Sequence, residues 1–154
     1  APVEILTGKY LSYIILGLAL GGILTALIRV LGVPFFGSFW AFFLTLLLVT
    51  VASLGLGFFI SLMSQSESQA VQLSMISLLA AVFFSGFFLP ISGLRLPIQY
   101  LAYALPVYYG REAFQRIFLI GSWPNPQHLL ALLALALFFF VLNSMLFARD
   151  YRKQ

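Results

Sequence analysis

The charged side chains that could take part in chemistry gather in one short segment that begins at Arg111. Glu112 and Arg116 are four residues apart with the acid first, which is the order that favours an ion pair on a helix. Arg111 and Gln115 occupy the neighbouring ridge of the same predicted helix. Two interpretations stay open for this set. It is either the solvated polar edge of an interfacial helix or the polar lining at the outer mouth of a pathway.

Asn143 and His128 are two further polar side chains that a functional site would draw on. Asn143 is the most polar side chain within an apolar run, where it either hydrogen-bonds a neighbouring helix or contacts a substrate. His128 is the only histidine, and its place beside Pro126 favours the start of a helix or an interface. Because no carboxylates or cysteines cluster with it, the sequence predicts no metal site.

The motifs of common enzymes are missing from the sequence. There is no Gly-x-Ser-x-Gly elbow and no Ser/His/Asp grouping that would support nucleophilic catalysis. A Gly-x-x-x-x-Gly-Lys-Ser/Thr phosphate loop is missing too, so the chain would not hydrolyse ATP by that route. The sequence therefore predicts no catalytic residue, no enzyme activity and no cofactor of its own.

The composition is that of a membrane protein. Hydrophobic residues make up 62% of the 154 residues, charged residues make up 8%, and the mean hydropathy is +1.08. A soluble domain carries about 25% charged residues. The net charge of +4 comes from basic residues scattered along the chain, without a basic patch that interleaves with aromatics. We therefore expect the lipid bilayer as a partner and no nucleic acid. With no cysteine, disulfides and thiolate metal sites are excluded.

The predicted fold is an all-α bundle of four transmembrane helices plus a re-entrant or interfacial helical hairpin, in a single transmembrane domain over residues 1–154. A span needs about 20 mostly apolar residues. Four stretches qualify, at 10–31, 38–63, 71–89 and 129–148. Residues 97–121 are interrupted by Pro106 and carry the polar set, and their apolar pieces are too short to cross a bilayer, so they predict the hairpin.

Small residues recur every four positions on several predicted spans. The three sets are Ser53/Gly57/Ser61, Ser77/Ala81/Ser85 and Gly17/Gly21. Such residues share one helix face and let backbones approach closely in lipid. They indicate one of two things. Either the stripes pack helices within the chain, or one of them lines a seam between subunits or a substrate path.

The two chain ends are expected on the same side, because the number of spans is even. The eight basic residues divide evenly between the two sides, so their count does not decide the orientation. The cluster of Arg149, Arg152 and Lys153 favours the inside for both ends. No span has an ionisable residue near its centre, which disfavours a proton- or sodium-coupled carrier.

Three pieces of the sequence match motifs of one transporter family. The opening Ala1–Lys9 is similar to a "TP-x-x-x-E-x-x-x-G-K" segment, although only its end keeps the register. Leu54–Ser61 followed by Gln69-Ala70 is similar to a "GLG-x-x-IS…QA" turn. The third and most specific piece has five elements in order, similar to "SGF-x-x-P…P…LP-x-x-Y…R-x-I…G": Ser85–Ile91, Leu96-Pro97, Leu105–Tyr109, Arg116-Ile117 and Gly121.

With these motifs the chain resembles the membrane subunit of an ABC-2 type transporter of the bacterial multidrug-export kind. The family's permeases have six spans, so the resemblance implies spans three to six, with the first two spans missing. The chain also begins at Ala1 without a methionine, and the apolar run after Lys9 is longer than a signal-peptide core of about 7–15 residues. We therefore expect a fragment or a processed chain.

The resemblance further implies partners and roles. A cytosolic ABC ATPase would bind ATP and magnesium, and a second permease copy or homologue would complete the path in the bacterial inner membrane, with both chain ends cytoplasmic. The residues 1–9 would be a cytosolic coupling segment. The implied coupling residues are Pro2, Glu4, Lys9, Gln65 and Glu67. The implied residues of the path or its outer gate are Ser85, Gly86, Pro90, Pro97, Pro106, Tyr108, Arg111, Glu112, Arg116 and Asn143.

The function expected from all this is export of an amphipathic or lipid-like substrate, driven by ATP hydrolysis in the partner. The alternative is a membrane-embedded assembly or scaffold protein that transports nothing itself. A membrane enzyme ranks third, because no acids, bases or metal ligands cluster.

Overall fold

A computed structural model describes residues 2–32, 35–88, 90–93 and 95–151. In these residues the chain is built of helices and contains no strand. The elements are α1 (Pro2–Val30), α2 (Phe39–Met63), α3 (Glu67–Phe84), the short 3-10 turn η1 (Ile91–Gly93), α4 (Leu96–Tyr103), α5 (Pro106–Gln115), η2 (Arg116–Ile120) and α6 (Pro126–Tyr151).

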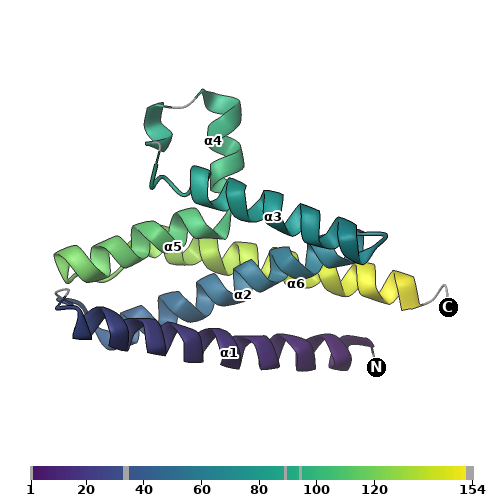
Figure 1. Cartoon of the computed structure of the whole chain (residues 1–154), viewed down its shortest axis with the longest axis horizontal. Coiled ribbons are helices and arrows are strands. Elements are labelled where there is room, and N and C mark those ends of the chain that lie inside the picture. The colour runs from purple at the N-terminus through teal and green to yellow at the C-terminus, as the bar shows by residue number, and fades with distance from the viewer. Residues whose placement is uncertain (1, 33–34, 89, 94, 152–154) are drawn as a thin grey trace.

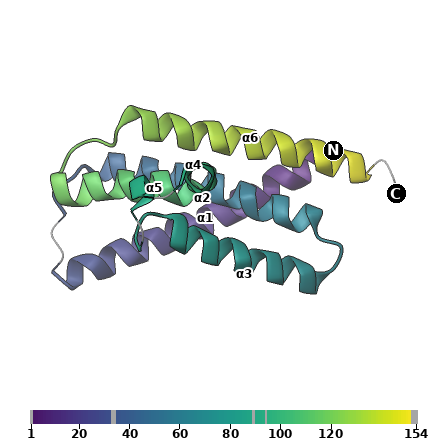
Figure 2. The same ribbon diagram turned by 90° about the horizontal axis from the view of Figure 1, so that it is seen from above.

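The long helices α1, α2, α3 and α6 lie side by side and alternate in direction (Figures 1 and 2). Both chain ends and the α2–α3 turn lie at one end of the bundle, which we call the terminal end. The α1–α2 and α5–α6 connections lie at the opposite end, which we call the far end. The first and the last described residues therefore lie at the same end of the bundle.

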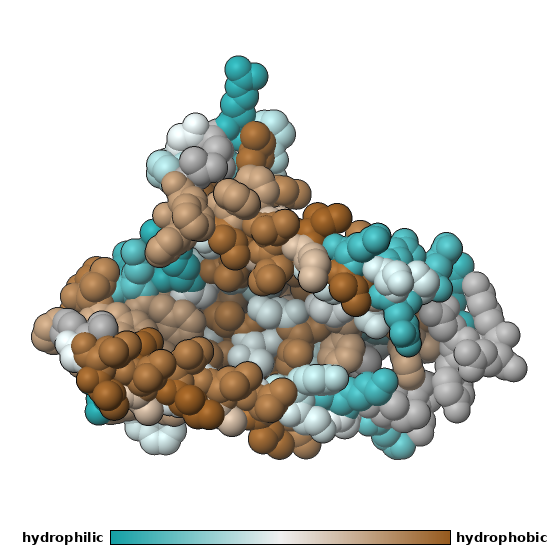
Figure 3. Space-filling view, in the orientation of Figure 1, coloured by the Kyte–Doolittle hydropathy of each residue, from teal (hydrophilic) through white to brown (hydrophobic). Residues whose placement is uncertain are grey.

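Among the described residues, four helices are long and apolar enough to cross a membrane, which confirms the predicted all-α membrane bundle. Their apolar segments are Thr7–Val30, Phe39–Met63, Glu67–Phe84 and Pro126–Arg149. Hydrophobic side chains cover most of the face seen in Figure 3, and hydrophilic ones gather at the terminal end, over α5 and at the tip of the α4 arm. That surface suits a bilayer, because the free energy of exposed apolar side chains is lower against lipid tails than in water.

The third span is shifted toward the terminal end relative to the predicted 71–89. It begins at Glu67 because Ser66 caps the helix, its side chain accepting a hydrogen bond from the Gln69 backbone N–H at 3.2 Å. It ends at Phe84 because Gly86 follows with φ +85°, a left-handed conformation that stops an α-helix. The predicted last residue of this span, Leu89, lies outside the described residues.

Helix α2 is the centre of the bundle and packs against α1, α5 and α6. Glycines allow the closest of these approaches. A Cβ added at Gly17 would lie 2.7 Å from Thr50 Cγ2, and one added at Gly21 would overlap Leu46. The predicted Gly17/Gly21 pair therefore serves packing within the chain, between α1 and α2.

The α2–α6 contact is held by apolar packing and one polar group. Ala52, Leu132 and Ala136 form a buried cluster between the two helices. Asn143 is completely buried, and its Nδ2 donates to the Gly55 carbonyl oxygen at 2.8 Å and to the Tyr10 hydroxyl at 3.1 Å. One side chain of α6 thus joins α2 and α1.

The predicted hairpin consists of α4 and α5, and each helix begins at a proline signal. Pro97 lies in the first turn of α4 and Pro106 in the first turn of α5, where a missing N–H costs nothing. Helix α4 runs crosswise to the spans and projects from the bundle, whereas α5 begins part-way along the bundle and runs to the far end (Figures 1 and 2). Helix α5 therefore follows only part of the length of the bundle.

The far end of α5 is fixed by a change of helix type and a glycine. The last turn, Arg116–Ile120, is a π-helix, and Gly121 ends it with φ +69°. A Cβ at Gly121 would lie 2.8 Å from the Phe36 carbonyl oxygen, so the backbone of the α1–α2 connection touches the end of η2. Ile117 packs beside this contact against Phe42 of α2.

Candidate functional site

A polar cavity of about 290 Å³ lies between α5 and the segment that joins α3 to α4. Helix α5 supplies its charged wall, and the α3–α4 segment and the end of α4 supply the others. The lining residues are Gly86, Pro90, Ile91, Ser92, Tyr103, Tyr108, Arg111 and Glu112. Five of the eight are among the residues predicted for the outer gate, so the structure brings much of that set together: Gly86, Pro90, Tyr108, Arg111 and Glu112.

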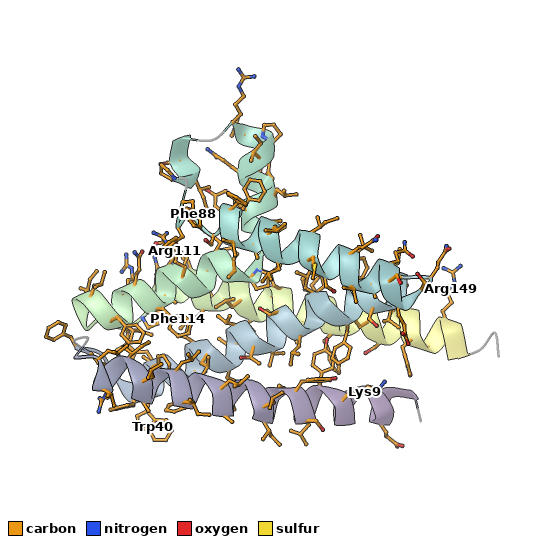
Figure 4. The ribbon with its side chains drawn as sticks, viewed as in Figure 1. Lys9, Trp40, Phe88, Arg111, Phe114 and Arg149 are labelled. Carbon is orange, nitrogen blue, oxygen red and sulfur yellow. The ribbon has the colours of Figure 1, made fainter. Side chains whose placement is uncertain are left out.

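Helix α5 presents these side chains because its two faces differ. Pro106, Gly110, Ala113 and Ile117 are buried and follow one face of the helix toward the bundle. Gly110 permits the contact, since a Cβ there would lie 2.7 Å from Val49 Cγ2 of α2. The opposite face therefore carries Tyr108, Arg111, Glu112 and Gln115 away from the bundle. In Figure 4, Arg111 and Phe114 leave α5 on opposite sides.

The cavity contains an ion pair between adjacent residues. Arg111 Nη1 lies 2.7 Å from Glu112 Oε1, and both side chains are about one-third exposed, at 28% and 31%. Glu112 pairs with Arg111 and not with Arg116, the residue four positions on that the spacing suggested. Arg116 is exposed and does not line the cavity, and Arg111 Nε is buried without a hydrogen-bond partner.

Gly86 lets Arg111 reach the end of α3. A Cβ at Gly86 would lie 3.0 Å from Arg111 Nη1, and the φ of +85° already disfavours other residues. The guanidinium therefore lies against the C-terminal end of α3, where the helix dipole attracts a positive charge. Ser85 ends the helix locally, with Oγ donating to the Val82 carbonyl oxygen at 2.8 Å and accepting from the Phe87 N–H at 3.3 Å.

Two tyrosines form an aromatic corner of the cavity. The rings of Tyr103 and Tyr108 meet edge to face, with centroids 5.2 Å apart and planes at 70°. Burial raises the pKa of Tyr108, and the neighbouring Tyr103 and Glu112 raise it further. The phenol is therefore neutral at physiological pH and can donate a hydrogen bond.

A second hollow, of about 280 Å³, lies between α2, α3 and the start of α5. The small residues Ser53 and Gly57 of α2 face Ser77 and Ala81 of α3 across it. No atom lies within 4 Å of a Cβ added at Gly57, so this stripe is not closely packed. Pro106, predicted for the gate, lines this hollow and not the polar cavity.

The comparisons with known proteins place the chain in a family. The model of the family described as ABC-2 type transporter matches residues 1–119, which contain the whole polar cavity. The chain belongs to the ABC-2 type transporter family. The resemblance found in the sequence motifs is thereby confirmed.

Two curated relatives of this ABC-2 chain are described as "Probable multidrug ABC transporter permease YbhS". They come from Escherichia coli strain K12 and from Escherichia coli O157:H7. Each is 32% identical over 124 residues, which is 79% of this chain and 33% of the relative. The match thus spans about a third of the length of these relatives. No solved structure matches the chain.

The coupling residues predicted for this ABC-2 chain lie at the terminal end. Helix α1 already includes residues 2–9, so the predicted segment is continuous with the first span. Glu4 lies in its first turn, and Lys9 is exposed. In the α2–α3 turn the Gln65 N–H donates to Gln69 Oε1 at 2.8 Å, and Glu67 is exposed in the first turn of α3. The side chain of Pro2 lies outside the described residues.

Asn143 and Pro97 do not line the polar cavity. The hydrogen bonds of Asn143 to two neighbouring helices fit the packing interpretation that the sequence left open. Pro97 is exposed at the start of α4, and its fixed φ suits that position. Ile91, Ser92 and Tyr103 line the cavity but were not predicted. Tyr103 could have been found from the sequence. It lies five residues before Tyr108, and the proline turn between them can bring the two rings together.

Proposed function

We propose that this chain is part of the membrane-spanning permease subunit of an ATP-driven exporter that moves an amphipathic or lipid-like substrate out of the cell. The observation that carries the proposal is the polar edge of α5, which runs beside apolar spans in a chain of the ABC-2 type transporter family. The relatives described as probable multidrug permeases support the class of substrate. In this proposal the chain itself catalyses no reaction.

The energy for transport would come from a cytosolic ABC ATPase that binds ATP and magnesium. The terminal end is the proposed docking side, because it gathers the start of α1 and the α2–α3 turn (Figure 1). Lys9 and Arg149 both lie toward this end in Figure 4, which agrees with a cytoplasmic side that is rich in basic residues. The chain would lie in the bacterial inner membrane with both ends in the cytoplasm, paired with a second permease copy or a homologue.

The far end would close the path. Helix α5 reaches the far end beside α2 and α6, and its polar edge faces the α3–α4 segment. A movement of α2 would be transmitted to the cavity through α5, because α5 packs at Gly110 directly against Val49 of α2. We propose that the ATPase stroke at the terminal end reaches the outer gate along this route.

Purification of the whole protein in mild detergent tests the proposal. We expect an ABC ATPase to co-purify, with ATP hydrolysis that vanadate inhibits. If the membrane protein is recovered without an ATPase, from membranes known to express one, the scaffold alternative replaces the transporter.

The change Glu4→Ala should reduce coupled ATP hydrolysis and transport by about fivefold or more, which is the lower range of coupling energies between sites. Glu4 lies at the terminal end in the first turn of α1. The helix itself should lose no more than about 1 kcal/mol, the usual value of an acidic group at a helix start. ATPase co-purification and substrate efflux measure the effect.

A matched control for this change is Ser12→Ala, which removes the hydroxyl group of an exposed residue of α1 about two turns further on. The control should dock the ATPase and transport normally. Wild-type docking and efflux in Glu4→Ala would show that the coupling surface lies elsewhere.

A further inference from the structure

We propose that the polar cavity beside α5 binds the zwitterionic head group of a phospholipid, with the phosphate on Arg111 and the amine between Glu112 and the tyrosine corner. The cavity carries one cationic and one anionic side chain next to each other. A phosphoethanolamine or phosphocholine group carries the same two charges in complementary order. The ligand class therefore follows from the charges of the lining residues.

The phosphate half is indicated by the unused donors of Arg111. A guanidinium has five N–H donors in a planar fork that matches phosphate oxygens. In the structure one nitrogen, Nη1, is bound to Glu112 Oε1, and the buried Nε has no partner. A buried donor without a partner is costly unless a ligand or water accepts its hydrogen bond. A phosphate in the cavity would accept hydrogen bonds from the part of the Arg111 guanidinium that lines it, and the Ser92 hydroxyl lines the same space.

The amine half is indicated by Glu112 and the two rings. Tyr103 and Tyr108 meet at 70°, which gives two ring surfaces at one corner of the cavity. An ammonium group gains from the face of an aromatic ring and from a carboxylate beside it. Glu112 would also repel a second negative charge. An anionic head group without an amine would thus satisfy Arg111 and leave Glu112 unfavourably placed.

The surroundings of the cavity suit the tails of such a lipid. Phe87 and Phe88 follow the end of α3 next to Gly86 and are 76% and 60% exposed. Leu101 and Tyr100 of α4 are also exposed, on the segment that brings Tyr103 to the cavity. Figure 3 shows hydrophobic surface on α3 and α4 beside the hydrophilic patch over α5. A head group in the cavity would therefore leave its acyl chains along an apolar surface.

This binding does not depend on the proposed export, because a lipid can occupy the cavity whether or not it is carried. The two proposals therefore fail separately: lipid retention tests the cavity, and ATPase co-purification tests the exporter.

Lipid retention can be measured on the whole protein purified from nanodiscs of equal parts phosphatidylethanolamine and phosphatidylglycerol, by native mass spectrometry. The wild type should retain phosphatidylethanolamine in excess. Glu112→Gln should lose that preference by about tenfold, which corresponds to about 1.4 kcal/mol for one charged contact. Arg111→Gln should lower the retention of both lipids. Arg95→Gln, which removes an exposed arginine of the α4 arm outside the cavity, should change neither.

Tyr103→Leu provides a second route if Arg111→Gln disturbs the end of α3. It leaves both charges in place, removes one ring of the corner, and should lower phosphatidylethanolamine retention by roughly threefold to tenfold. Soluble phosphoethanolamine should displace the lipid only at high concentration, because it lacks the tails. Displacement at equal concentration would mean that the ligand is a small phosphate compound. Equal retention of the two lipids by the wild type, or a preference for phosphatidylglycerol, would overturn the proposal.

Discussion

Replacing Gly55 with alanine should destabilise the membrane domain by about 2 kcal/mol, within the usual range for adding a methyl group to a tightly packed position. The added Cβ would lie 2.5 Å from Phe139 Cβ and 3.3 Å from the Tyr10 hydroxyl oxygen. Phe139 Cβ is bonded to the backbone of α6, so it moves away only if the helix moves. The change would separate α2 from α6 and lengthen the hydrogen bond from Asn143 to the Gly55 carbonyl oxygen.

Gly57→Ala is the matched control, because it makes the same change two residues further along α2. Nothing lies within 4 Å of a Cβ at Gly57, so only the helix preference of alanine remains. That preference is worth up to about 1 kcal/mol in favour of alanine. Equilibrium unfolding in mixed detergent and lipid micelles, followed by tryptophan fluorescence, compares the two variants. Equal stabilities would show that α2 and α6 do not approach as closely as the structure has them.

This pair of glycines also shows what the sequence could not predict. The regular spacing of Ser53, Gly57 and Ser61 placed Gly57 on a face that serves packing, a subunit seam or a substrate path, but the close contact within the chain is at Gly55, outside that stripe. Spacing identifies the residues that share a helix face. It does not give the rotation of the helix against its neighbours, which depends on the side chains of α6 and α1 far along the chain.

The spans and the hairpin, in contrast, were predictable from local chemistry. The length of apolar runs requires helices in a bilayer, since every backbone polar group must be satisfied internally. Pro97, Pro106 and Gly121 mark the first turn of α4, the first turn of α5 and the end of η2. These residues act through their own backbone geometry, so their effect can be predicted without knowledge of the tertiary contacts.

The candidate cavity was predictable only in part. The family motif and the charges pointed to Gly86, Arg111 and Glu112, and the structure gathers them. The partner of Glu112 was predicted as Arg116 from helix spacing alone. Arg111 takes that place because Gly86 leaves room for its guanidinium at the end of α3, a contact between segments 25 residues apart.

Asn143 should matter for stability and not for substrate choice. We expect Asn143→Ala to cost about 2 kcal/mol, because it removes two hydrogen bonds and leaves a small cavity. Asn143→Leu should cost about 1 kcal/mol, because leucine refills the space and only the polar contacts are lost. The side chain is completely buried and donates to Gly55 and Tyr10, so it reaches neither hollow that a substrate would enter.

A double-mutant cycle with Tyr10→Phe separates the polar link from packing. The Tyr10 hydroxyl accepts the Asn143 amide hydrogen bond at 3.1 Å. Tyr10→Phe should therefore destabilise the wild type by about 0.6 kcal/mol, the average for a hydrogen bond between membrane helices, and cost close to nothing in Asn143→Leu. Asn143 Oδ1 is itself buried without a partner, which limits what the amide contributes and is one reason to expect a modest coupling. A different result would place the Asn143 side chain on the transport path: Asn143→Leu changes the range of exported substrates, while the double-mutant cycle still gives the expected interaction energy with Tyr10.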